Sequence, residues 1–247
     1  MVQYLIENNA DVNILDSKHK TPLSYAVFFN NYCLVKYLLY TSKNVDYNIL
    51  DANRLTYLYY AIFNNYYSIT SLLLDMSKDK IQDKYINVAI KNNNIDIFRL
   101  LLSNKTNITD TSLFYALDNL IIPYGSTVNY TSIDILYILF THKPNLEIKN
   151  SFGDNPIHHY AKIITRFSYQ FICNNIQYFN IILYELIKYN PYDLLSLKNI
   201  ENKSFVTILS YNSEPILNMF LTYINHVFKE HAEFIDYLTA LNTICNM

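Results

Sequence analysis

A six-residue segment recurs along this chain, and its recurrence limits the possible folds more than any other feature of the sequence. The clearest copy is Thr-Pro-Leu-Ser-Tyr-Ala at residues 21–26. Thr21 can cap the N–H groups at a helix start, and Pro22 suits the first helical position because no N–H is needed there. Leu23 and Ala26 would share one face, one large and one small, so that another helix can approach closely. The segment therefore predicts the start of a short, closely packed helix.

Five other segments repeat this pattern, of which the second is degenerate and the last is faint. They lie at residues 56–61, 84–89, 111–116, 155–160 (with Ala161 next) and 204–209. Pairs of large apolar residues recur where the second helix of each unit is expected, at Leu38-Leu39, Leu73-Leu74, Leu101-Leu102, Leu139-Phe140 and Leu186-Ile187. Such a pattern indicates a repeat protein, in which short units stack into one elongated domain.

Asparagine takes the place of glycine at the predicted helix ends. The chain has only two glycines, and asparagine follows the helical segments at Asn9, Asn30-Asn31, Asn64-Asn65 and Asn92–Asn94. Asparagine tolerates the left-handed conformation that ends many helices. The scarcity of glycine is therefore compatible with tight turns between short helices.

Polar turns precede the first two complete copies of the segment. Residues 10–13 are echoed by residues 45–48, and polar residues follow each at 16–20 and 51–54. With these motifs the chain resembles the ankyrin repeat, a β-turn plus two helices of about 33 residues. The resemblance is strong over residues 1–75, moderate over 95–165 and weak after about 200. It implies an all-α ankyrin-repeat solenoid of helix-turn-helix units with irregular loop insertions and short turn hairpins.

The repeat boundaries are expected to follow the recurring segments. We expect residues 1–247 to form a single ankyrin-repeat domain that opens inside a repeat. It would consist of a partial repeat at 1–15, repeats at 16–50, 51–80, 81–109, 110–149 and 150–198, and a degenerate repeat or C-terminal helical cap at 199–247. Within that last part, residues 214–227 and 230–245 have the apolar spacing of two amphipathic helices.

The spacing between copies is irregular. The third copy follows the second by 28 residues (84 − 56) and the fourth follows the third by 27 (111 − 84), which predicts shortened turns. By contrast, 44 residues separate the fourth and fifth copies (155 − 111), so a loop is expected around residues 120–130, with a similar excess over about 162–177. In the fifth copy Tyr160 replaces the small residue, and helix packing there must loosen or rearrange.

Composition excludes several classes of protein. Half of the residues are hydrophobic and the net charge is −2, which gives a continuous core and no basis for a nucleic-acid or anionic-membrane surface. The 25 tyrosines are therefore expected to serve in the core or in interfaces rather than in base stacking. Cys33, Cys173 and Cys245 lack paired spacing, and neither a signal peptide nor an 18-residue apolar stretch is present. We therefore expect a cytoplasmic protein with reduced thiols.

No catalytic or metal-binding motif emerges from the sequence. His158 and His159 are adjacent, so on a helix they would point about 100° apart, which is poor geometry for one metal. The ankyrin resemblance instead implies that His158 hydrogen-bonds within its turn. His226 and His231 lack companions with ligand spacing, and the two glycines stand alone, so no phosphate-binding loop exists. We expect no enzyme, no cofactor and no metal.

The resemblance implies a non-enzymatic scaffold for protein–protein interaction. Stacked ankyrin units expose their turn tips and inner helices as one extended surface for a protein partner. The abundance of Asn, Ile, Tyr and Lys, together with irregular, asparagine-capped units, is most similar to the ankyrin-repeat proteins of poxviruses. That resemblance implies a viral protein that binds a host factor in the host cytoplasm. Protozoan and giant-virus ankyrin proteins share the composition.

Two alternatives remain open. Many poxvirus relatives act as substrate adaptors of a cullin ubiquitin ligase through a C-terminal F-box-like segment, but the usual start of that segment is not evident in residues 213–247. The chain could also be a truncated gene remnant. The expected partner is a host or cellular protein, with cullin ligase components as the second choice, and with neither nucleic acid nor membrane.

The turn tips supply the candidate binding residues. Neighbouring repeats place equivalent residues side by side, so the two regular turns would present a positive ridge on a slightly acidic chain. This ridge consists of Lys18, His19, Lys20, Asn53 and Arg54. A positive ridge favours a partner with an acidic patch, because complementary charge steers association.

The N-terminal edge yields the first testable prediction. Val2, Leu5 and Ile6 form an apolar stripe that no preceding unit in the sequence covers, whereas terminal repeats normally present a polar outer face. We expect amide hydrogens of residues 2–8 to exchange faster than those of residues 35–39, or this helix to self-associate. Equal protection of the two segments in a monomer would show that the chain start is a true cap.

Overall fold

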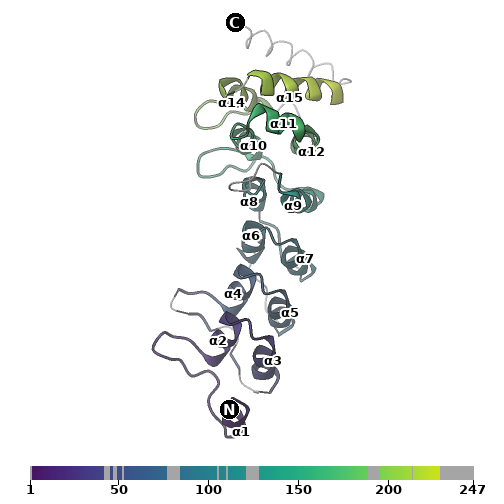
Figure 1. Ribbon diagram of the computed structural model, residues 1–247. Helices are drawn as coiled ribbons and strands as arrows, with labels where there is room; N and C mark the ends of the chain where they lie inside the picture. The colour runs from purple at the N-terminus through teal and green to yellow at the C-terminus, as the bar shows by residue number, and fades with distance from the viewer. Residues whose placement is uncertain are drawn as a thin grey trace. The chain divides into compact units, whose positions relative to one another are not determined.

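The computed structural model describes residues 2–41, 45–46, 49–51, 53–76, 84–104, 106–109, 111–120, 128–188, 195–212 and 214–228. The chain divides into two compact units, Met1–Thr109 and Asp110–Met247. The described elements of both units are helices joined by turns (Figure 1), which confirms the predicted all-α fold of stacked helix-turn-helix units. None of the described helices is long and apolar enough to cross a membrane.

The first unit consists of short helices stacked in two rows (Figure 1). They are α1 (Val2–Glu7), α2 (Pro22–Phe28), α3 (Tyr32–Thr41), α4 (Tyr57–Phe63), α5 (Tyr67–Met76), α6 (Lys84–Lys91) and α7 (Ile95–Ser103). Helices α2, α4 and α6 pack in succession to form the inner row, and α3, α5 and α7 form the outer row. Each inner helix also packs against the outer helix that follows it in the chain. The turns before α2 and α4 project on the side away from the outer row.

The second unit continues the same scheme with longer outer helices. It contains α8 (Ser112–Asp118), α9 (Tyr130–Thr141), α10 (Pro156–Ile164), α11 (Tyr169–Asn174), α12 (Ile176–Ile187), α14 (Phe205–Asn212) and α15 (Glu214–Val227). Helix α10 packs between α8 and α14, while α12 packs against α9 and α15. The first of the two predicted C-terminal helices is thus present as α15; the second, at 230–245, lies outside the described residues, as do residues 121–127 of the expected loop.

Helix starts follow the recurring segment. The Thr21 hydroxyl accepts a hydrogen bond from the Ser24 N–H at 3.1 Å, and the Ser24 hydroxyl accepts one from the Thr21 N–H at 2.9 Å. The same capping bond occurs at Thr56, Asn155 and Ser204. A capping side chain satisfies one of the N–H groups that a helix leaves unpaired at its start. The segment therefore fixes where each of these inner helices begins.

Helix ends follow the predicted asparagines. Asn9, Asn30, Asn65 and Asn93 adopt left-handed backbone conformations, with φ between 52° and 61°. After α2, the Asn31 N–H reaches back to the Ala26 carbonyl at 2.9 Å, which is the hydrogen bond expected of a left-handed helix cap. The prediction that asparagine replaces glycine at these ends is confirmed.

Tyr160 shows how a large residue is accommodated where other inner helices have alanine. Its ring is fully buried, and its hydroxyl donates to the Phe179 carbonyl of α12 at 2.6 Å. Helix α10 nevertheless packs against α8. The rearrangement expected at this position therefore includes a new polar contact with the outer helix, which satisfies the buried hydroxyl.

The excess of residues predicted over about 162–177 contains an additional helix. Helix α10 extends to Ile164, and α11 occupies residues 169–174. The rings of Phe167 and Phe171 stack at 4.7 Å, and the Phe179 ring packs edge-on against Phe167 at 5.5 Å. Burial of this aromatic cluster stabilises a six-residue helix that local sequence alone would not hold.

The N-terminal helix is exposed as the apolar stripe predicts. Val2 and Leu5 are 38% and 49% exposed, whereas Val35 and Leu38, which occupy the corresponding positions of α3, are 0% and 1% exposed. Apolar side chains at equivalent positions of the two helices thus differ strongly in exposure.

Substitution of Tyr160 tests the contact between α10 and α12. Tyr160→Phe removes the hydroxyl and leaves the buried Phe179 carbonyl without that donor. The carbonyl lies inside α12 and keeps its helical donor, so we expect the free energy of unfolding to fall by about 0.5–1.5 kcal/mol, the usual net contribution of one hydrogen bond. Tyr137→Phe, on the exposed face of α9, is the matched control and should change it by less than about 0.5 kcal/mol. Equal effects in urea unfolding would contradict this role of the Tyr160 hydroxyl.

Candidate protein-binding surface

The turn before α2 is built on one aspartate side chain. One carboxylate oxygen of Asp16 accepts from the N–H groups of Lys18 at 2.8 Å and Lys20 at 2.9 Å, and the other accepts from the Tyr25 hydroxyl. The Asp16 N–H and the Lys20 carbonyl pair at 3.0 Å. The hydrogen bond from Tyr25 is the main cause that lowers the pKa of Asp16. This acid therefore serves the turn rather than presenting its charge to a partner.

The turn before α4 repeats this arrangement. Asp51 accepts from the N–H groups of Asn53 and Leu55, both at 2.9 Å, and from the Tyr60 hydroxyl. Burial raises the pKa of Asp51, but the hydrogen bonds from Tyr60 and the turn outweigh it, so the net pKa is lowered. The Asp46 N–H donates to the Asn13 side chain at 2.9 Å. This hydrogen bond joins the segment before the second turn to the segment before the first. The bases of the two turns are thereby held together.

The candidate residues of the positive ridge lie on these turns. Lys18, His19, Asn53 and Arg54 are exposed, and Lys20 is partly buried. His19 and Arg54 occupy equivalent left-handed positions, with φ of 55° and 59°. Lys20 differs from the others in reaching helix α2, since its ammonium lies 4.9 Å from the centre of the Phe28 ring. Its charge therefore borders the surface of the inner helices.

Two more turns of the same kind occur in the second unit. Asn150 accepts from the N–H groups of Phe152 and Asp154, and Asn199 accepts from those of Glu201 and Lys203. The second of these turns was not predicted from the sequence. The sequence feature that indicates this turn is an asparagine, Asn199, five residues before the faint helix start at Ser204. The same spacing separates Asp16 from Thr21.

Exposed aromatic side chains lie on the inner helices beside the first two turns. Phe28 of α2 and Phe63 of α4 are 54% and 52% exposed, and they are 35 residues apart, as are Tyr25 and Tyr60. The Tyr25 ring stacks on Phe29, and the Tyr59 ring stacks on Phe63. The sequence analysis assigned such residues to core or interface packing in general and did not single them out. The sequence feature that indicates them is the repetition of tyrosine and phenylalanine at positions outside the buried helix face.

A pocket opens between α2 and α4 within this aromatic surface. It has a volume of about 140 Å³ and is lined by Lys20, Ser24, Val27, Phe28, Asp51, Tyr57 and Tyr60. The Tyr57 hydroxyl pairs with the Thr21 hydroxyl at 2.7 Å, and Tyr60 donates to Asp51. Burial is the main cause that raises the pKa of both tyrosines. Both therefore stay neutral near pH 7 and offer aromatic walls.

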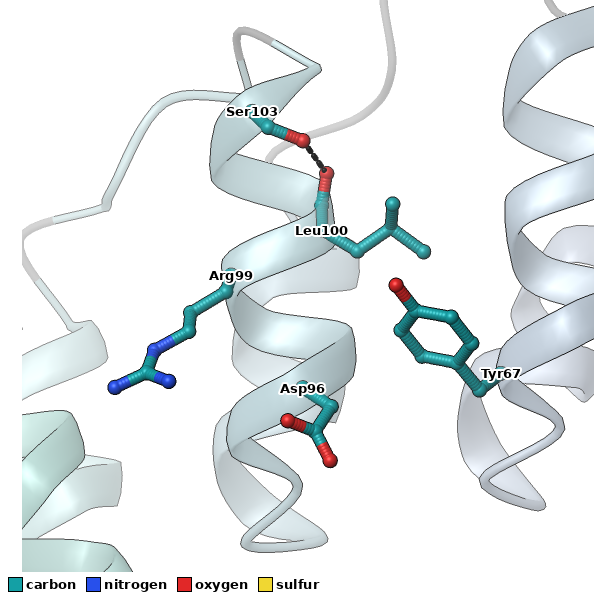
Figure 2. A pocket seen from close by; sticks show the side chains of 5 residues that line it. All are labelled: Tyr67, Asp96, Arg99, Leu100 and Ser103. Carbon is teal, nitrogen blue, oxygen red and sulfur yellow. Dashed lines mark hydrogen bonds between the residues drawn. The ribbon is translucent and has the colours of Figure 1, made fainter.

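Two larger depressions lie away from this surface. One, of about 410 Å³, lies along α5 and α7 and is lined by Tyr67, Asp96, Arg99, Leu100 and Ser103. Figure 2 shows that Asp96 and Arg99 point in different directions and that the Tyr67 ring faces Leu100. The other, of about 310 Å³, is lined by Phe140, Lys143, Pro144, Leu146 and Glu185. Neither brings together groups that converge on one point, as a ligand site requires.

The adjacent histidines serve separate structural partners. The His158 ring is buried; its Nδ1 accepts from the Asn155 N–H at 3.3 Å, and its Nε2 donates to the Leu197 carbonyl at 2.8 Å. His159 Nε2 instead meets Asp118 of α8 at 2.9 Å. Among the described residues, no group of three or more His, Cys, Asp or Glu side chains is placed to hold a metal ion.

Comparison with known proteins identifies the family. Two overlapping segments, residues 1–85 and 26–112, match the family described as ankyrin repeats (3 copies). No curated protein matches the chain in sequence. Residues 1–112 therefore belong to the ankyrin-repeat family.

Solved structures show the same fold at low sequence identity. The ankyrin repeat domain of Bcl-3, a member of the IkappaB protein family, is 16% identical with a TM-score of 0.64, and the match covers 90% of each chain. The human ASB11 ankyrin repeat domain is 19% identical with a TM-score of 0.62, covering 90% of this chain and 91% of that one. An ankyrin repeat domain from Acinetobacter baumannii is 15% identical with a TM-score of 0.61, covering 82% and 97%. These matches establish the fold alone.

The buried His158 makes stability depend on pH. Burial lowers the pKa of this ring, and protonation would remove the Nδ1 acceptor of the Asn155 N–H. The unfolded state, with a histidine pKa of about 6.5, then binds the proton more readily than the folded state. We expect stability to be fully present above about pH 6.5 and to fall as the pH drops from 7 to 5.5. Urea unfolding of wild type and His158→Gln measures this slope.

The variant isolates the contribution of His158 from that of other groups. His158→Gln should flatten the slope between pH 7 and 5.5, even if its stability is lower throughout. His226→Gln, at an exposed position on α15, should leave the slope as in the wild type. An unchanged slope in His158→Gln would show that this ring does not titrate between the two states.

Proposed function

We propose that this ankyrin-repeat chain is a non-enzymatic scaffold that binds another protein through the turns and inner helices of its first unit. The observation that carries the proposal is the exposed aromatic surface of α2 and α4 beside the cationic residues of two paired turns. A rigid surface of this kind loses little conformational entropy on binding. Aromatic side chains supply large contact areas, and arginine and aromatics are the residues enriched where binding energy concentrates.

The ridge of Lys18, His19, Lys20, Asn53 and Arg54 is proposed to guide this partner. The acids at the base of both turns are engaged by N–H groups and by tyrosine hydroxyls. These acids keep their negative charge within the turns, while Lys18, Lys20 and Arg54 supply cations to the ridge. Such a ridge favours a partner with an acidic patch and raises the association rate more than the final affinity.

The assignment to a subgroup of ankyrin-repeat proteins rests on sequence resemblance. We propose a viral protein of the poxvirus ankyrin type that binds a host factor in the host cytoplasm, on the grounds of composition and of its irregular, asparagine-capped units. The cullin ligase adaptor remains the alternative; its usual C-terminal segment would fall in a part of the chain that lies mostly outside the described residues. Cullin components among the captured proteins would favour the adaptor.

The role of the ridge is tested by affinity purification of the partner from candidate host cells, followed by measurement of its association rate. Replacement of Lys18, Lys20 and Arg54 by Ala together should slow association with the captured partner roughly tenfold at low ionic strength, because charge steering is lost. The salt dependence of the association rate should weaken at the same time, since exposed charges are screened within about 10 Å at 0.1 M salt.

A charge-matched variant controls for the loss of three cations. Replacement of Lys36, Lys149 and Lys198 by Ala alters exposed positions away from the first two turns. It should leave the association rate within about twofold of the wild type. If both triple variants behave alike, the partner does not bind at the ridge.

A further inference from the structure

We propose that the pocket between α2 and α4 is an anchor site for one apolar side chain of a partner segment whose neighbouring residues are acidic. This inference rests on the proposed protein-binding function and specifies the chemistry of the partner. It follows from three properties of the pocket: its walls, the pairing of its polar groups and the charge at its rim.

The walls of the pocket suit an apolar side chain. Val27 and the rings of Phe28, Tyr57 and Tyr60 supply most of the lining. The volume of about 140 Å³ is several times the share of one water molecule in the liquid, about 30 Å³. A side chain of the size of leucine or phenylalanine therefore fits, and its burial removes both it and the exposed Phe28 face from water.

The polar groups inside the pocket already have partners. The Tyr57 hydroxyl pairs with Thr21, and the Tyr60 hydroxyl donates to Asp51. Asp51 also accepts two backbone N–H groups of its turn. A basic side chain from a partner would have to compete with these donors for the carboxylate. The interior of the pocket therefore favours an apolar group over a cation.

The pocket carries a cation, Lys20, and the anionic Asp51 that also lines it is held by hydrogen bonds within its turn. Lys20 lines the pocket, and its ammonium lies over the Phe28 ring at 4.9 Å and near the Tyr25 ring at 5.7 Å. Lys18 and Arg54 extend this charge along the two turns. Asp46, which lies in the segment before the second turn, is exposed and does not line the pocket. A carboxylate next to the inserted side chain would meet Lys20 on a partly apolar surface, where an ion pair is less screened than in water.

The next step of the stack, α4–α6, keeps only part of this arrangement. Phe63 and Tyr85 stand at the positions of Phe28 and Tyr57. Val88 stands at the position of Tyr60 (88 − 60 = 28), and Leu55 stands at that of Lys20 (55 − 20 = 35). The arrangement of aromatic walls beside a lysine is therefore specific to the α2–α4 step, and a partner is expected to insert one anchor there.

Peptide selection tests the proposal on the full chain. A library of random 12-residue peptides is selected against the wild-type protein, and enriched peptides are measured by fluorescence anisotropy. We expect them to share a leucine or aromatic residue next to aspartate or glutamate. Replacing that apolar residue with serine should weaken binding at least tenfold. In the protein, Phe28→Ala and Lys20→Glu should each weaken binding at least tenfold.

Matched controls identify where the peptides bind. Phe152→Ala removes an equally exposed phenylalanine from a turn of the second unit, and Lys36→Glu reverses an exposed charge on α3; both should bind peptides as the wild type does. Phe28 is itself exposed, so the unfolding midpoint of Phe28→Ala should be nearly unchanged. Peptides without the acidic and apolar pair, peptides indifferent to Phe28→Ala and Lys20→Glu, or a library that yields no binder would each overturn the proposal.

The outcome also separates this inference from the broader function. If capture of the cellular partner depends on Lys18, Lys20 and Arg54 while selected peptides ignore the pocket, the anchor site is wrong and the scaffold function stands. If neither depends on this face of the first unit, both are wrong.

Discussion

The hydrogen bonds of one side-chain oxygen in each regular turn determine the geometry on which the inner helices depend. In the turns that begin at Asp16, Asp51, Asn150 and Asn199, this oxygen accepts the N–H groups two and four residues later. The capping residue of the next helix follows one position after the second of these donors. Because both ends of the turn are fixed by the same atom, the helix starts at a defined place and direction.

These bonds also explain how the chain manages with two glycines. The fourth residue of each turn is left-handed, and only one of the four, Gly153, is glycine; the others are His19, Arg54 and Asn202. A residue with a side chain loses roughly 1–2 kcal/mol there. The Asp16 turn makes two backbone bonds and two bonds to the carboxylate oxygen, each worth about 0.5–1.5 kcal/mol. Their sum offsets the strain, so a polar tip residue can stand where glycine is common.

Local features were predictable from the sequence, and contacts between residues far apart in the chain were not. The capping residues, the left-handed asparagines and the all-α stack follow from rules that act within one turn of helix. The contacts of Tyr57 with Thr21, Tyr160 with Phe179 and His158 with Leu197 join residues 19 to 39 positions apart. No local rule gives such pairs, because they depend on how neighbouring helices and turns are placed. Helix α11 was missed for the same reason, since its stability comes from the aromatic cluster with α12.

The candidate binding surface could likewise be predicted from the sequence only in part. Turn tips could be located from spacing alone, so the sequence gives the positions of Lys18 and Arg54 directly. The pocket required the structure, because tyrosine and phenylalanine in a repeat protein are expected in the core. Tyr57 illustrates the difficulty: it stands at the position of Pro22 in the preceding copy and is only 3% exposed, yet it lines the pocket together with Tyr60. A buried tyrosine of the stack can thus also contribute to a pocket wall, which the residue type alone does not indicate.

The turn hydrogen bonds therefore connect stability with recognition. N–H groups and tyrosine hydroxyls hold the carboxylates of Asp16 and Asp51 within their turns, although both acids keep their negative charge. The tyrosines that donate these bonds, Tyr25 and Tyr60, lie on the same inner helices as the exposed Phe28 and Phe63. Each bond thus fixes a ring in place while it occupies the acid, and what remains for a partner is an ordered aromatic face bordered by lysine and arginine. Replacing either aspartate would loosen the turn, release the ring and change the surface charge at once, whereas replacing the tip cations changes the charge alone.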